Sequence, residues 1–267
     1  MRGILRAIPA SYGIIATPFV FDSVNDLAFS VRKVNPAYSG GCMRIRRSTD
    51  NTELEIGFVS GDLDTSAIST FCGASLGYVV RWYDQSGNAN DKFNTTAINQ
   101  PVIYNNGFTL RNGKPYISAT STQWLYLATN YIQGTEDFTF FMTVEKNTAG
   151  DQAILLAYNA AYSWLDYGFD QYVAGSNAIT ISLLYAINTL YLNNIISDYD
   201  VGSEIFRNGV SIGTMGLNSS NGGIRYLPSN LYRTATILFS EFIWYKADKR
   251  TTSLDMRNNI NNYYSIY

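Results

Sequence analysis

Apolar and polar residues alternate along much of the chain at the spacing of β-strands. In the segment 138–145, every second residue is apolar, which predicts a strand that buries one face: Phe138, Phe140, Met142 and Val144. The segment 235–246 is almost continuously apolar and is the longest run of this kind. It predicts a central strand of the core.

Three Asn-Gly pairs divide the strand-like segments: Asn106-Gly107, Asn112-Gly113 and Asn208-Gly209. Asn and Gly tolerate the positive φ of a two-residue hairpin turn. The segments 204–207 and 210–214 on either side of the last pair therefore predict a hairpin.

Helical spacing is confined to two segments. Thr65–Cys72 is a short candidate helix, with Asp62 or Asp64 as its N-cap. From Thr252 to about residue 264 the apolar residues recur at helical spacing and predict a stripe against the sandwich: Met256, Ile260, Tyr263 and Tyr267. On this prediction Arg257, Asn258 and Asn261 face water.

Composition supports a β-rich fold and limits the chemistry. Aromatic residues make up 15% of the chain, charged residues also 15%, the net charge is −2, and histidine is absent. The lack of histidine excludes Ser-His-Asp and Cys-His catalysis and removes the commonest zinc ligand. The low charge and the absence of a long apolar run predict no nucleic-acid partner and no membrane partner. We also expect no cofactor.

The two cysteines, Cys42 and Cys72, allow one disulfide at most. Their spacing does not decide whether they pair, and two buried free thiols are the favoured interpretation.

Two parts of the sequence resemble known families. The first is the ordered series Phe29–Lys33, Tyr38–Gly40, Met43–Thr52, Ile56–Phe58, Gly61–Thr65 and Trp82–Asn88, of which the last reads Trp-Tyr-Asp-Gln-Ser-Gly-Asn. This series resembles the N-terminal part of the family 54 arabinofuranosidase catalytic domain, and it is more similar still to arabinofuranosidase-like modules of phage tail and fibre proteins. The second part, Phe239–Tyr245 and the terminal helix, resembles the closing strand and helix of laminin-G-like domains.

This resemblance implies an all-β fold: a two-sheet antiparallel jelly-roll sandwich of the concanavalin and laminin-G type, with a short C-terminal helix. We expect one such domain over residues 26–267. Residues 1–25 form an apolar arm, broken by Pro9, Gly13 and Pro18, that is a possible assembly anchor. The arm either folds back on its own sandwich or adds to a neighbouring subunit.

The sequence departs from the enzyme family at the site. In the family, a Phe-Cys pair similar to Phe71-Cys72 is followed five residues after its Cys by a second Cys, and here that position is Gly77. The enzymes also have an adjacent Cys-Cys pair that lines the sugar pocket, which this chain lacks. After about residue 120, no segment matches the one that holds the enzyme's nucleophile.

The motif of residues 82–88 is predicted to be structural: Trp82, Tyr83, Asp84, Gln85, Gly87 and Asn88. An Asp carboxylate at the end of a strand accepts backbone N–H groups two or three residues on, and Gly supplies the unusual backbone angle. Arg44 and Arg46 alternate with Met43, Ile45 and Arg47 on a predicted strand, which favours an ion-paired or solvated face over a phosphate site.

Carboxylates are the remaining candidates for chemistry. Calcium takes oxygen ligands, so a site built from Glu53, Glu55, Asp62, Asp64 and Asp84 is conceivable, but capping of the short helix is the favoured role. A retaining glycosidase needs two carboxyl groups roughly 5–5.5 Å apart. The candidates for such a pair are Glu136, Asp137, Glu145, Asp151, Asp166, Asp170 and Glu241.

An aromatic and polar stretch over residues 158–172 is the best candidate for a glycan surface, because aromatic rings stack on sugars while polar side chains bind their hydroxyl groups. Its candidate residues are Tyr162, Trp164, Asp166, Tyr167 and Tyr172. Core packing is the competing explanation for this stretch.

From these features we expect a non-enzymatic phage virion protein of a tail, fibre, spike or head decoration. It would be located on the particle surface, assemble with other virion subunits as a homo-oligomer, and possess a surface for host glycan. Two alternatives remain: a glycoside hydrolase acting on arabinose-containing glycans, and a lectin-like module of a bacterial adhesin.

Overall fold

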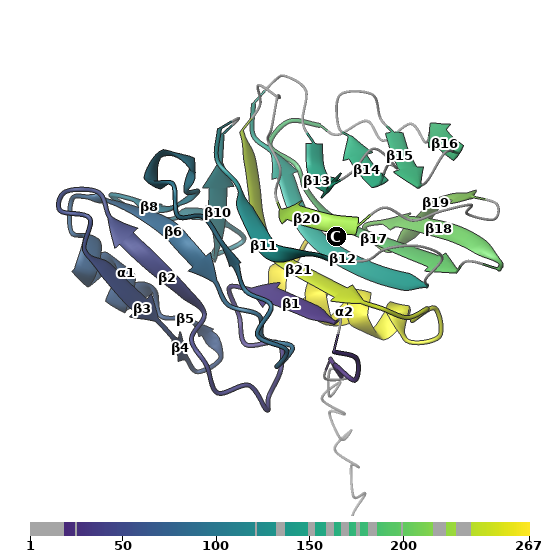
Figure 1. The fold of residues 1–267 in the computed structure, drawn as a ribbon, viewed down its shortest axis with the longest axis horizontal. Helices are drawn as coiled ribbons and strands as arrows, with labels where there is room; N and C mark the ends of the chain where they lie inside the picture. The colour runs from purple at the N-terminus through teal and green to yellow at the C-terminus, as the bar shows by residue number, and fades with distance from the viewer. Residues whose placement is uncertain are drawn as a thin grey trace, which may run out of the picture.

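A computed structural model describes residues 19–24, 26–120, 122–131, 137–148, 153–158, 163–166, 171–174, 177–180, 186–198, 200–215, 223–227 and 236–267. Within these residues the chain forms two layers of strands with a C-terminal helix outside one layer (Figure 1). All of the described strand pairings are antiparallel.

The first layer has the segment predicted to be central near its middle. Strand β21 (Ile237–Tyr245) pairs on one side with β12 (Phe138–Lys146), and on the other with both β1 (Leu27–Ser30) and β10 (Lys114–Ala119). Beyond β12 follow β17 (Leu190–Asp198), β18 (Gly202–Arg207) and β19 (Val210–Met215). Both long strands predicted from the sequence are confirmed as core strands, because β21 is buried throughout and β12 over all but its last residue.

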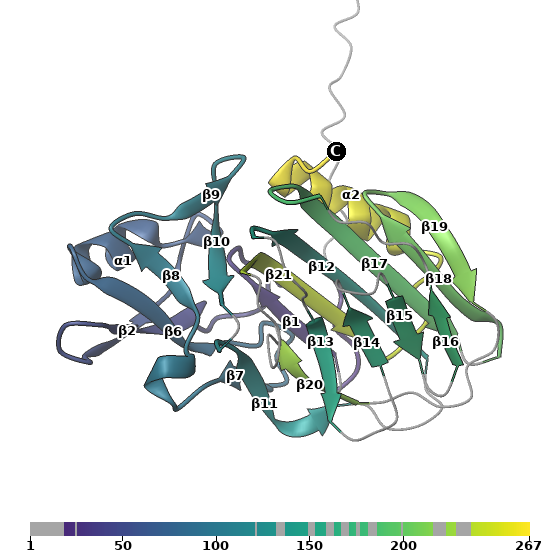
Figure 2. The same ribbon diagram turned by 90° about the horizontal axis from the view of Figure 1, so that it is seen from above.

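The second layer begins with the strands of the N-terminal half: β3 (Glu53–Ile56), β2 (Met43–Arg47), β6 (Leu76–Trp82), β7 (Lys92–Phe93) and β11 (Leu125–Tyr131). It continues, described by the backbone, through β20 (Gly223–Leu227), β13 (Ala153–Tyr158), β14 (Ser163–Asp166), β15 (Gln171–Ala174) and β16 (Asn177–Thr180). Figure 2 shows β13 to β16 lying across one face of β12, β17 and β18, with the C-terminal helix on the other.

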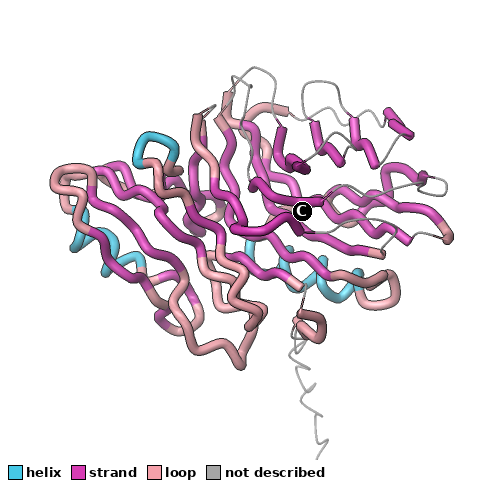
Figure 3. The backbone as a smooth tube through the Cα atoms, in the orientation of Figure 1, coloured by secondary structure: helices cyan, strands magenta, loops and turns pink. Residues whose placement is uncertain are grey.

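Short elements join and flank the layers. Strand β8 (Val102–Asn105) pairs with β6 and β10, and β9 (Thr109–Arg111) pairs with β10. A separate small sheet contains β4 (Phe58–Val59) and β5 (Asp62–Leu63), and Ala97–Asn99 form a single 3-10 turn. The helices α1 (Thr65–Cys72) and α2 (Ser253–Tyr264) lie at the outside of the strands (Figure 3). Neither helix in the described part of the chain has the length and apolar content that crossing a bilayer requires.

Aromatic side chains fill the space between the layers. The ring centre of Trp82 on β6 lies 5.7 Å from that of Phe29 and 5.6 Å from that of Phe239, which both belong to the first layer. Phe138 and Phe140 stack on Trp244 across the β12–β21 pair. These contacts confirm the predicted all-β jelly-roll sandwich with its short C-terminal helix.

Two of the three Asn-Gly pairs form the predicted hairpins. Asn112-Gly113 connects β9 to β10 and Asn208-Gly209 connects β18 to β19, and all four residues have positive φ. Asn106-Gly107 also turns with positive φ, but the prediction of a hairpin is wrong there. The flanking strands β8 and β9 both pair with β10 and not with each other.

The terminal helix lies where the sequence predicts it, but its buried face differs. Met256 and Ile260 are buried as expected. The buried tyrosine is Tyr264, whereas Tyr263 is half-buried and Tyr267 is exposed. Arg257 was expected to face water and instead is buried, because its guanidinium donates to Asn194 Oδ1 on β17 and lies 3.9 Å from the ring centre of Phe206.

The end of the predicted arm lies on its own sandwich. Phe19 is buried, and Phe21 stacks on Tyr245 of β21 with ring centres 5.4 Å apart. Residues 1–18 lie outside the described residues, so the anchor role of the arm stays a prediction.

Lys92 on β7 has a basic side chain that lies in the core of the sandwich. Its side chain is fully buried, and its amine nitrogen lies 5.5 Å from the ring centre of Phe29 without a hydrogen-bond partner among the described residues. Burial holds the pKa of Lys92 well below its ordinary value, and the charge of Asp84 opposes this shift only in part.

We expect Lys92→Met to flatten the pH dependence of stability. Between the lowered native pKa and the ordinary value of about 10.4, the unfolded chain binds a proton at this lysine that the native protein does not bind. The free energy of unfolding therefore rises with pH in this window. Its slope is up to about 1.4 kcal/mol per pH unit steeper in the wild type than in the variant. Urea unfolding at several pH values from about 7 to 9 measures both slopes. Equal slopes would mean that Lys92 is charged in the native protein.

The cysteines are two buried free thiols, as the favoured interpretation has it. Cys72 ends α1 and Gly77 lies at the start of β6, opposite Tyr104 on β8. A Cβ atom added to Gly77 would lie 2.8 Å from Cys72 Sγ, and its backbone is outside the left-handed region. This separation is close to the roughly 3 Å between the Cβ of one cysteine and the Sγ of the other in a disulfide.

We therefore predict that Gly77→Cys forms a disulfide with Cys72 under mild oxidation. Intact mass and blocked thiol labelling of Cys72 measure its formation, and the Gly77→Ala variant adds the Cβ without the thiol. A fully reactive Cys72 in the oxidised Gly77→Cys protein would show that the two segments are held apart.

Candidate functional site

The motif of residues 82–88 leaves β6 and binds β1 and the segments on both sides of it. Asp84 is buried and accepts hydrogen bonds from the backbone N–H groups of Ala28, Ser86 and Asn90, and from the Ser86 hydroxyl. The bond from Ser86 is the turn that the sequence predicts. Burial raises the pKa of Asp84, although these hydrogen bonds act in the opposite direction.

Gln85 and Asn88 extend the same contacts. The Gln85 side chain is fully buried, accepts from Val34 N and donates to the carbonyl oxygens of Ser30 and Arg32. Asn88 donates to the carbonyl oxygens of Ser23 and Asp26. Gly87 has a φ of +98°, which favours glycine. The polar side chains of the motif therefore hold backbone in place and have no free group for chemistry.

Glu241 is held by four hydrogen bonds from other side chains. It lies on β21, is buried, and forms a two-pronged ion pair with Arg32 at 2.8 and 2.9 Å. It also accepts from the hydroxyl groups of Ser30 and Tyr264. Burial by itself lowers the pKa of Arg32, but the charge of Glu241 and its hydrogen bonds raise it above its ordinary value.

Glu145 on β12 has the same kind of partner. Its carboxylate is buried and accepts two hydrogen bonds from the guanidinium of Arg111 on β9. Two of the seven candidate catalytic carboxylates, Glu145 and Glu241, are thus ion-paired. Both side chains are also fully buried, so neither carboxylate is exposed to a substrate.

The carboxylates considered for calcium are dispersed. Asp64 caps α1 by accepting from Ala67 N, as predicted, and Asp62 accepts from the Tyr263 hydroxyl beside the Lys114 amine. Glu53 and Glu55 pair with Arg44. Within the described ranges no group of three or more acidic, Cys or His residues could hold a metal ion.

The arginines of β2 form no anion site. Arg44 is ion-paired on the surface, in line with the favoured interpretation. Arg46 is buried, lies 4.6 Å from the ring centre of Tyr78, and donates to Gln100, Asn51 and the carbonyl oxygen of Ala97. Its hydrogen-bonding capacity is therefore used by neutral acceptors.

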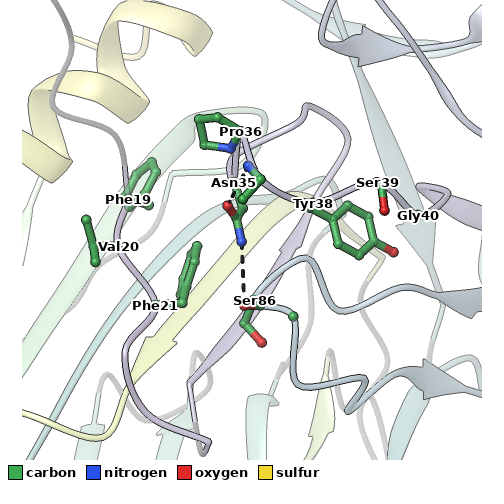
Figure 4. Close-up of a pocket in the computed structure, with 11 residues that line it drawn as sticks. Phe19, Val20, Phe21, Asn35, Pro36, Tyr38, Ser39, Gly40 and Ser86 are labelled. Carbon is green, nitrogen blue, oxygen red and sulfur yellow. Dashed lines mark hydrogen bonds between the residues drawn. The ribbon is translucent and has the colours of Figure 1, made fainter.

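A cavity of about 840 Å³ lies beside the motif, in the size range of ligand pockets. Its wall contains Ser86 and Gly87, the segment Phe19–Phe21, and the loop Asn35–Gly40. Figure 4 shows the two phenylalanine rings on one side of the cavity and Tyr38 on the other. In the sequence, Tyr38–Gly40 stands out only as part of the family resemblance. Its neighbours in the cavity include Phe19–Phe21 and Ser86, which its own sequence does not reveal.

Three of the five candidate glycan residues fall on strands β14 and β15. Trp164 and Asp166 belong to β14 and Tyr172 to β15, whereas Tyr162 and Tyr167 lie outside the described residues. Trp164 pairs with Val173 and Tyr172 pairs with Leu165, so these two aromatic residues occupy adjacent rows of the ladder. Their role in glycan binding stays a prediction.

Comparison with known proteins confirms the arabinofuranosidase part of the sequence resemblance. The family model for the catalytic domain of α-L-arabinofuranosidase B matches residues 25–124. No curated protein matches the sequence.

Three solved structures of arabinofuranosidases are similar to this chain. A GH54 α-L-arabinofuranosidase soaked with a cyclic sulfate inhibitor is 15% identical, with a TM-score of 0.64. The aligned region covers 88% of this chain and 62% of the enzyme chain. A point mutant of such an enzyme, soaked with 4-nitrophenyl α-L-arabinofuranoside, is 16% identical with a TM-score of 0.68, with the same 88% and 62% covered. An arabinofuranosidase complexed with arabinofuranosyl-α-1,2-xylobiose is 16% identical, with a TM-score of 0.61. The aligned region covers 86% of this chain and 61% of that chain. The chain therefore spans about three fifths of the length of these proteins, and at this identity the likeness shows the fold.

These matches contradict the expectation of a non-enzymatic virion protein. That expectation rested on the missing pocket cysteines and on the lack of an assignable acid/base pair. Cysteines in a pocket wall transfer no proton in glycoside hydrolysis, which depends on two carboxyl groups. Their absence was therefore weak evidence against an enzyme, and the matched family is a catalytic domain. The expected virion location and subunit partners stay untested.

We predict that Glu241→Gln destabilises the protein by about 3–5 kcal/mol, because it leaves the buried Arg32 guanidinium without a counter-charge. Chemical denaturation measures the change, and the control is Glu55→Gln, which removes an exposed pair with Arg44. A loss below about 1 kcal/mol for Glu241→Gln would mean that the pair is not desolvated in solution.

Proposed function

We propose that this chain is a glycoside hydrolase domain that cleaves terminal arabinofuranosyl groups from arabinose-containing glycans. The match of residues 25–124 to an arabinofuranosidase catalytic domain carries this proposal. A sandwich that aligns with family 54 enzymes over 86–88% of the chain supports it.

The ion pairs narrow the choice of catalytic carboxylates. Glu145 and Glu241 are occupied by Arg111 and Arg32, and Asp84 is occupied by backbone N–H groups. The remaining candidates from the sequence are Glu136, Asp137, Asp151, Asp166 and Asp170. Three of them, Asp151, Asp166 and Asp170, lie in the sequence close to or within the aromatic stretch expected to bind glycan.

The chemistry requires only carboxyl groups from this set. One carboxyl group acts on the sugar's anomeric carbon or activates a water molecule, and the other donates a proton to the leaving oxygen. The absence of histidine and of a pocket Cys-Cys pair leaves this mechanism intact.

Release of 4-nitrophenol from 4-nitrophenyl α-L-arabinofuranoside tests the proposal on the purified full chain. We expect hydrolysis above the buffer rate, and a loss of at least about 100-fold in kcat for the Asn or Gln variants at two of the five remaining carboxylates. Asp255→Asn, on the exposed side of α2, is the matched control and should retain activity.

Two results would contradict the proposal. One is a folded protein without activity on arabinofuranosides. The other is activity that survives all five substitutions.

A further inference from the structure

The cavity beside the 82–88 motif has a neighbour that is lined in part by the same loop. A second cavity of about 560 Å³ is lined by Lys33, Glu55 to Phe58 and Gly61. Both cavities share Tyr38, Ser39 and Gly40 as a common wall. We call the two cavities together the Tyr38 trough.

The aromatic rings of the trough are held in place before any ligand arrives. Phe21 is stacked between Phe19 and Tyr245, with ring centres 6.4 and 5.4 Å apart. Tyr38 donates its hydroxyl to the carbonyl oxygen of Gly41. A Cβ at Gly40 would lie 2.3 Å from that hydroxyl, so the ring packs directly over the glycine backbone. Rings fixed in this way lose little conformational entropy when a ligand binds.

Gly57 supplies an independent observation. Its backbone is outside the left-handed region, and a Cβ at this position would meet no atom within 4 Å. Neither backbone conformation nor packing therefore requires glycine there. Gly57 lines the second cavity, and its missing side chain leaves space there.

The polar groups of the trough are few and balanced in charge. Lys33 and Glu55 bring one charge of each sign to the second cavity, and Ser39 lies exposed on the shared wall. A strongly anionic or cationic ligand gains nothing from such a pair. Hydroxyl groups can accept from the lysine and donate to the carboxylate.

From this geometry we infer that the Tyr38 trough is a binding site for neutral oligosaccharide, separate from the hydrolytic site. The C–H faces of sugar rings carry partial positive charge and stack on the negative face of Tyr38. The hydroxyl groups bond to Ser39, Lys33 and Glu55. The trough binds without cleaving, because Glu55 is the one carboxylate in its lining and is held by Tyr83 and Arg44.

Saturation-transfer NMR titration of the full chain with 1,5-α-L-arabinotriose and with xylotriose tests the inference. Gly57→Phe fills the second cavity, and Val59→Phe adds the same ring to the exposed side of the neighbouring strand β4. Tyr38→Ala removes the shared ring, and Tyr38→Phe keeps it. We expect Kd to rise about tenfold or more in Gly57→Phe and Tyr38→Ala and to change less than about twofold in the two matched controls.

The outcomes separate this site from the hydrolytic one. Loss of binding in Gly57→Phe with unchanged hydrolysis of 4-nitrophenyl α-L-arabinofuranoside supports the inference, and so does loss of binding if the chain proves inactive. If Gly57→Phe fails to fold, Ala37→Trp fills the first cavity instead. Undiminished trisaccharide binding in the filled and Tyr38→Ala variants, or a trough that binds peptides and no neutral sugar, overturns it.

Discussion

The buried ion pair between Arg32 and Glu241 is the constraint on which the arrangement of this sandwich depends. Two charges in an apolar interior are tolerated only when each has a partner and further hydrogen bonds. Here the partners come from different parts of the chain: Arg32 follows β1, Glu241 lies on β21, and Tyr264 ends α2. The pair therefore fixes the N-terminal strand, the central strand and the last helix relative to one another.

A second set of polar contacts acts beside it. The carbonyl oxygen of Ser30 accepts from Gln85, while the Ser30 hydroxyl donates to Glu241. One strand residue thus connects the ion pair to the loop of residues 82–88. Because so much buried polar surface is committed to the architecture, the carboxylates in these networks are not free for catalysis. On the proposed function, the chemistry belongs to other carboxylates, and the candidates are Glu136, Asp137, Asp151, Asp166 and Asp170.

The sequence predicted those features that depend on local order. Alternating residues located β12, an Asn-Gly pair located the β18–β19 turn, and Asp64 located the start of α1. It failed where the outcome depends on a distant partner. Arg257 is buried and donates to Asn194 on β17, and β9 pairs with β10 instead of β8. The partner of Glu241 could not be inferred either, since Arg32 lies 209 positions away. The expectation of a non-enzyme failed for a different reason, because it took missing cysteines as evidence about proton transfer.

Covalent labelling tests the division between structural and catalytic carboxylates most directly. An arabinofuranose-configured cyclic sulfate is an electrophile that a nucleophilic carboxylate opens to form a stable ester. After incubation with the full chain, peptide mass mapping identifies the labelled residue. Our account predicts a single label on Glu136, Asp137, Asp151, Asp166 or Asp170. A label on Glu145 or Glu241 would contradict it.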